Sequence, residues 1–117
     1  MVKTLTVEFL EDNGACTTGR RAFKRKYKRG AKTETVIYAA AVFGRYWLGW
    51  LLSHTLEQSE QEWLRWELLQ NFGMKPGELI NVGWPALDTK TLKQMFRSYF
   101  KNLREDWYVS AGIRPIS

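Results

Sequence analysis

Side chains able to bind an anion are concentrated in one short segment of this chain. Seven of the ten residues at positions 20–29, here called the basic segment, are cationic: Arg20, Arg21, Lys24, Arg25, Lys26, Lys28 and Arg29. The whole chain has 18 Lys and Arg against 12 Asp and Glu, so outside the basic segment 11 cations face 12 carboxylates. A local block of positive charge attracts polyanions to one place. The basic segment therefore predicts contacts with the phosphates of DNA or RNA, or with an acidic protein surface.

A second group of cations repeats at helical spacing near the end of the chain. At about 100° per residue, it covers roughly one quarter of a helix circumference and comprises Lys90, Lys93, Arg97, Lys101 and Arg104. A solvated helix surface has the same composition, because Lys and Arg are common on exposed faces. If this stripe and the basic segment lie on the same side of the fold, we expect one continuous phosphate-binding surface.

Residue types that carry out catalysis or bind metals are scarce. The single cysteine, Cys16, and the single histidine, His54, leave no Cys and His set for structural zinc and no intramolecular disulfide. Cys16 has no nearby base partner, and the glutamates from Glu57 to Glu67 suit the first turn of a helix better than a metal site. We therefore expect a protein that is not an enzyme and needs no cofactor.

The composition predicts a single domain over residues 1–117. Apolar residues make up 44% of the chain and aromatic residues 15%, which is enough material for a packed core. The apolar run at 36–52 is shorter than the roughly 20 residues of a membrane span and has Arg45 at its middle. We expect a core helix there rather than a membrane segment, and a cytoplasmic location because cysteine is rare.

The expected fold class is α+β and mainly helical. An apolar helix at about 34–54 lies at the centre, with Gly44 and Gly49 marking close packing or a break. Amphipathic helices surround it, and strands at 3–10 and 107–113 pair in a small sheet.

The remaining elements follow from capping residues and apolar periodicity. A helix from about Ala15 to Gly30 carries the basic segment, with Phe23 and Tyr27 turned inward. Ser59 and Glu62 form a capping box for a helix that ends at Gly73. Asp88 caps a helix that runs to about residue 105, with an apolar stripe of Leu92, Met95, Phe96, Tyr99, Phe100 and Leu103. Residues 75–87 read as a loop. The apolar spacing at 68–84 resembles a helix-turn-helix, but its second helix is poor in base-reading side chains.

A short pattern in the first third of the chain favours an origin in a phage or mobile genetic element. Ala15 and Cys16, followed by Gly19, Phe23, Gly30 and Thr33, resemble a pattern in small bacterial and phage proteins of unknown function. The matching part covers about 20 residues, and the resemblance implies a phage or mobile-element origin without implying an activity.

Two functions fit the sequence. The first is a non-enzymatic nucleic-acid-binding protein that contacts phosphates with weak sequence specificity. The alternative is a small phage- or mobile-element-encoded inhibitor or adaptor, similar in action to anti-CRISPR proteins, that occupies a partner protein's nucleic-acid groove or acidic surface. An exposed Trp among the six in the chain would anchor that contact.

Overall fold

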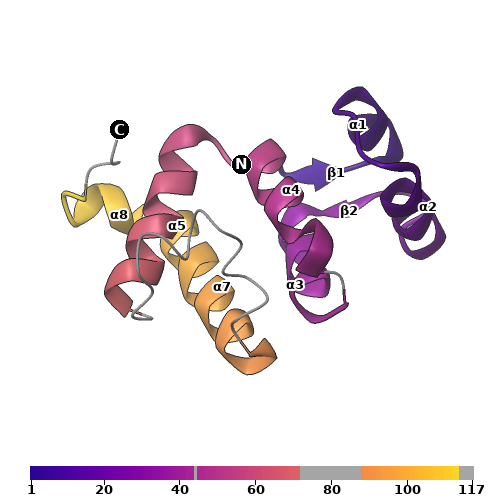
Figure 1. Ribbon diagram of the computed structural model, residues 1–117. Helices are drawn as coiled ribbons and strands as arrows, with labels where there is room; N and C mark the ends of the chain where they lie inside the picture. The colour runs from indigo at the N-terminus through magenta and orange to yellow at the C-terminus, as the bar shows by residue number, and fades with distance from the viewer. Residues whose placement is uncertain (44, 72–87, 114–117) are drawn as a thin grey trace.

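The computed structural model describes residues 1–43, 45–71 and 88–113 (Figure 1). These residues form a mainly helical α+β fold with a two-stranded antiparallel sheet, which confirms the predicted fold class. In chain order the elements are β1 (Thr4–Leu5), α1 (Val7–Asp12), α2 (Thr17–Lys26), β2 (Ala31–Lys32), α3 (Thr33–Phe43), α4 (Arg45–Thr55), α5 (Gln58–Asn71), α7 (Thr89–Arg104) and α8 (Trp107–Ser110).

The strand predicted at residues 3–10 is wrong beyond Leu5. Thr6 ends β1 and caps α1, because its Oγ1 accepts a hydrogen bond from the Phe9 N–H at 3.1 Å. Glu8 then lies in the first turn, where a negative charge favours the helix dipole. The cap therefore outweighs the apolar and polar alternation that predicted a strand.

The predicted pairing of N- and C-terminal strands is also wrong. β1 pairs with β2, with Leu5 opposite Ala31 and Thr4 opposite Lys32. The C-terminal residues form the short helix α8, whose Tyr108 is fully buried and stacks on Trp63 with ring centroids 5.3 Å apart. The aromatic residues that predicted a strand serve packing against α5 instead.

The predicted helix through the basic segment is confirmed, with narrower bounds. α2 covers Thr17–Lys26, and the chain turns at Gly30, whose φ is +88°. Phe23 is buried and Tyr27 is half-buried, with their ring centroids 5.2 Å apart. Both aromatic rings thus point inward, as expected.

The single central helix expected at 34–54 is two helices, α3 and α4, that pack against each other. One straight helix of that length would extend about 31 Å, which exceeds the shorter dimensions of a molecule measuring 39 × 28 × 25 Å. Two shorter helices bury the apolar surface of the run against itself, including Ile37, Ala41 and Leu48. Gly44 lies outside the described residues.

The helix predicted after Asp88 is confirmed. Asp88 Oδ1 accepts from the Thr91 N–H at 2.6 Å and starts α7. The predicted apolar stripe faces the core, and its fully buried members are Leu92, Met95, Phe96, Tyr99 and Phe100. α7 packs against both α3 and α5.

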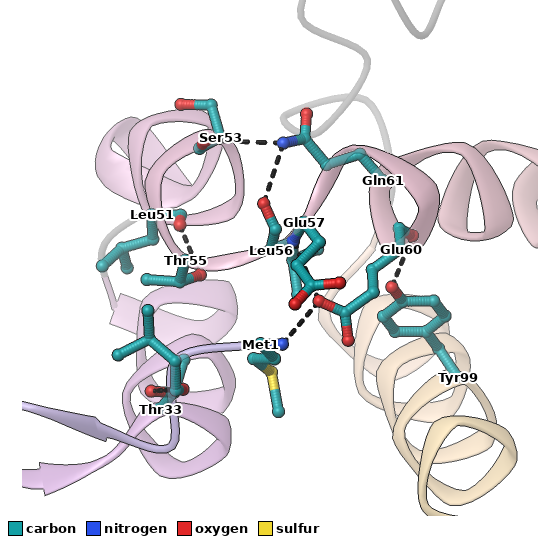
Figure 2. A network of polar contacts seen from close by, with 11 residues as sticks. Met1, Thr33, Leu51, Ser53, Thr55, Leu56, Glu57, Glu60, Gln61 and Tyr99 are labelled. Carbon is teal, nitrogen blue, oxygen red and sulfur yellow. Dashed lines mark hydrogen bonds and ion pairs between the residues drawn. The ribbon is translucent and has the colours of Figure 1, made fainter. Parts of the chain in front are cut away.

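Helix α5 (Gln58–Asn71) starts two residues earlier than the predicted capping box implied. Its cap is the Glu60 carboxylate, which accepts from the Glu57 N–H at 2.9 Å (Figure 2). The same carboxylate binds the Met1 ammonium at 2.6 Å, and the Glu60 carbonyl accepts from the Tyr99 hydroxyl. These contacts join the start of the chain to α5 and α7.

Three expectations lie outside the described residues. They are the end of the α5 helix at Gly73, the loop at 75–87, and most of the helix-turn-helix spacing at 68–84. Within the described ranges, no helix is both long enough and apolar enough to cross a membrane.

Two glycines with positive φ give a matched test of the turn that leads from α2 into β2. We expect Gly14→Ala to cost about 1 kcal/mol, the ordinary strain of an L-residue at positive φ, because its Cβ meets no neighbour. Gly30→Ala should cost clearly more, because its Cβ would lie 2.7 Å from the Leu5 carbonyl oxygen. Urea unfolding followed by Trp fluorescence measures both, and equal losses would contradict this account of the turn.

Candidate functional site

Three cations of α2, together with Lys28 just beyond its end, gather on one surface. Arg21, Lys24, Arg25 and Lys28 line an open hollow on the surface, and we call this set the α2 cationic face. At about 100° per residue, the three on α2 fall within roughly 100° of the helix circumference, on the side opposite Phe23. All four side chains are exposed.

Local contacts on the inner side of α2 set this orientation. Cys16 Sγ caps the helix by accepting from the Gly19 N–H at 3.3 Å. The Trp47 indole of α4 lies close to Gly19, where a Cβ would come within 3.4 Å of Nε1. Phe23 continues the same side into the core. Because the inner side is packed, the cations remain on the solvent side.

Within the described residues, the α2 cationic face carries positive charge that no ion pair compensates. In the part of the chain that the structure describes, no carboxylate forms an ion pair with any of the four cations. Arg21 and Arg25 are like charges four residues apart within α2, a spacing that destabilises a helix. The helix dipole favours the cations of the last turn and offsets part of this repulsion. A bound anion would relieve the rest.

The other three cations of the basic segment do not belong to the α2 cationic face. Arg20 is half-buried, and its Nη2 donates to Thr17 Oγ1 at 3.2 Å. The Lys26 ammonium lies 5.4 Å from the centre of the Tyr27 ring, a cation–π contact. Arg29 is exposed beyond the end of α2. Arg20 and Lys26 therefore have intramolecular contacts, whereas the α2 cationic face points to solvent.

The second predicted stripe lies on the outer side of α7. Lys90, Lys93, Arg97 and Lys101 are exposed, opposite the buried apolar stripe. Arg104 is the exception, because its Nη1 donates to both carboxylate oxygens of Glu34 at 2.9 and 2.7 Å. This ion pair links the end of α7 to the start of α3.

The two cationic groups belong to separate parts of the molecule. Figure 1 shows α2 at one end, with α3 and α4 between it and α7. α3 packs against α7, and α2 packs against α1. The sequence left open whether the two groups lie on the same side of the fold, and the structure separates their helices by α3 and α4.

The residues weighed as catalytic candidates are engaged locally. His54 stacks on Trp50 with ring centroids 4.2 Å apart, and its Nδ1 lies 2.9 Å from the Trp50 carbonyl oxygen. Cys16 serves as the α2 cap. Across residues 1–43, 45–71 and 88–113, no group of three or more His, Cys, Asp or Glu side chains is arranged to hold a metal ion.

A buried polar cluster between α5 and α7 is structural. Glu67 is buried, and its Oε1 accepts from Ser98 Oγ at 2.9 Å and from Asn102 Nδ2 at 3.5 Å. Burial, followed by the nearby Glu67 charge, raises the pKa of Tyr108, and burial raises the pKa of Tyr99. Both phenols therefore remain neutral at physiological pH.

The tyrosine beside the α3–α7 contact responds to the charges around it. Burial is the main cause that raises the pKa of Tyr38, and the Glu34 charge adds to the effect. Arg97 and Arg104 oppose both. Tyr38 thus lies within the field of the α7 cations without being part of their solvent-exposed row.

Sequence reasoning left the exposed aromatic residues unassigned. The structure exposes Tyr46 by 90% at the start of α4 and Trp107 by 40% in α8, beside Val109. Trp63 and Trp66 are only partly exposed and pack against α8. Tyr46 directly precedes Trp47, whose side chain contacts α2. Because adjacent residues of a helix do not face the same way, this position could have indicated that Tyr46 is exposed.

No protein family, curated protein or solved structure matches the chain.

Removing one charge from the α2 cationic face should stabilise the folded protein. At low salt we expect Arg21→Gln to raise the free energy of unfolding by roughly 0.2 to 0.5 kcal/mol for each repulsive pair removed. The matched control Arg104→Gln should lower it by less than about 1 kcal/mol, because it removes an exposed ion pair. Urea unfolding at low and high salt compares the two. A loss of stability in Arg21→Gln would indicate that the face is structurally paired.

Proposed function

We propose that this is a non-enzymatic, cytoplasmic nucleic-acid-binding protein that contacts phosphates through the α2 cationic face, with weak sequence specificity. The observation that supports this most is the convergence of four exposed cations on one hollow with no carboxylate partner among the described residues. Phosphate oxygens supply the missing negative charge.

The dimensions of the face suit a phosphate backbone. Arg21 and Arg25 are four residues apart, about 6 Å along the helix, and a duplex strand presents a phosphate roughly every 3.4 Å of its axis. Two neighbouring phosphates of one strand therefore fall within reach of the face. Phe23 and Tyr27 point inward, so the face offers charge rather than rings for base stacking. Contacts of this kind position a protein on nucleic acid but do not read its sequence.

The salt dependence of binding tests this proposal. We expect the logarithm of the affinity for a labelled 20-base-pair duplex to fall with the logarithm of salt with a slope of about −0.9 per phosphate contact. The variant Arg21→Gln with Arg25→Gln should weaken binding and reduce that slope by roughly 1.8. Fluorescence anisotropy at several salt concentrations measures both quantities.

A charge-matched control separates the face from net charge. Lys3→Gln with Arg65→Gln removes two exposed cations outside the basic segment. We expect this control to bind with nearly the wild-type slope. Equal losses in the two double variants would contradict a role for the α2 cationic face, and absence of binding by the wild type at low salt would overturn the proposed function.

The exposed end of α8 favours a second candidate function, the phage-encoded inhibitor or adaptor. Trp107 and Val109 are exposed, and the Trp107 ring lies 6.0 Å from that of Trp66. Trp is enriched in the hot spots of protein-binding surfaces. In this function the α2 cationic face would occupy an acidic or nucleic-acid-binding surface of a partner protein.

Affinity capture after nuclease treatment distinguishes the two functions. For the adaptor we expect one stoichiometric protein partner that survives nuclease, and Trp107→Ala should release it. If the captured material is only nucleic acid that nuclease removes, the adaptor function is excluded and nucleic-acid binding is supported.

A further inference from the structure

We propose that α7 carries a second phosphate-binding face, so that one molecule bridges two nucleic-acid segments. The α7 cationic face consists of Lys90, Lys93, Arg97 and Lys101. The inference rests on the proposed function, because it assigns the same ligand chemistry to a separate surface.

The α7 cationic face is a regular row of charge. At about 100° per residue its four members fall within roughly 80° of the helix circumference and extend about 16 Å along the axis. All four are exposed, and no carboxylate in the described ranges forms an ion pair with them. The row is thus as free to bind phosphates as the α2 cationic face. Arg104 stands apart because Glu34 already neutralises it.

The two cationic faces lie on helices in different parts of the molecule, and each is opposite the buried side of its own helix. On α2 the cations lie opposite buried Phe23, and on α7 they lie opposite buried Tyr99. Figure 1 places α3 and α4 between the two helices, in a molecule 39 Å along its longest axis. The two faces are therefore separate surfaces, with the α3–α4 pair between their helices.

Two separate faces favour two ligands over one. Short duplexes resist bending, so a single straight duplex contacts one face without wrapping to the other. Each face then holds a different segment, and the protein joins them. On a long nucleic acid the second contact becomes intramolecular and raises the overall affinity.

A two-duplex capture assay tests bridging. A biotinylated 15-base-pair duplex is fixed on beads, the protein is added at low salt, and a fluorescent 15-base-pair duplex of unrelated sequence follows. We expect the wild type to retain the fluorescent duplex. Lys93→Gln with Arg97→Gln should reduce this retention by at least about 5-fold while the protein still binds the fixed duplex through α2. Lys3→Gln with Arg65→Gln serves as the charge-matched control and should bridge as the wild type does.

The outcomes separate this inference from the proposed function. If no protein binds the fixed duplex, the proposed function fails. If the protein binds but retains no second duplex, bridging alone is overturned. Bridging is also overturned if the α7 variant retains the second duplex as well as the wild type, because two self-associated molecules, each bound to one duplex through its α2 face, would then explain retention.

Discussion

Burial of the apolar side of α7 is the interaction on which the rest of the structure depends. Its aromatic residues meet both neighbours: Phe100 contacts Tyr38 of α3 with ring centroids 5.7 Å apart, and the Tyr99 hydroxyl donates to the Glu60 carbonyl of α5. Fully burying one large apolar side chain contributes roughly 1.5 to 3 kcal/mol, and five such side chains of α7 are buried. The Glu34–Arg104 ion pair and the Met1 contact with Glu60 add polar links across the same junction.

The two cationic faces follow from the same constraint. Once Phe23 fixes the inner side of α2 and Tyr99 that of α7, the Lys and Arg residues of the two cationic faces are left exposed to solvent. Folding requires these positions to be polar, but it does not require them all to be positive. The absence of carboxylate partners for the α2 cationic face within the described ranges is therefore a feature that folding does not require, and the proposed anion binding would account for it.

The sequence predicted the helices where capping and periodicity agreed, as at Asp88 and along the stripe from Leu92 to Phe100. It failed where a local cap or tertiary packing outweighed a pattern: Thr6 starts a helix inside an alternating segment, and Tyr108 stacks on Trp63 instead of entering a sheet. The apolar run after residue 33 folds back on itself because burial, not helix propensity, decides its shape.

Site residues were predictable by type but not by partner. Arg20 and Arg21 are neighbours of the same chemistry, yet one donates to Thr17 and the other faces solvent. The pairing of Arg104 with Glu34 joins residues 70 positions apart, which no local pattern contains. Both distinctions arise from the arrangement of helices, so they become visible only in the folded chain.

A ¹H–¹⁵N NMR titration with a short duplex at low salt tests the central claim most directly, because it locates the contact residue by residue. The account predicts that the largest shift changes fall on α2 from Arg21 to Lys26 and on the following Lys28, with smaller ones along α7 and none in α8. Changes centred on Trp107 to Val109, with α2 unaffected, would contradict it.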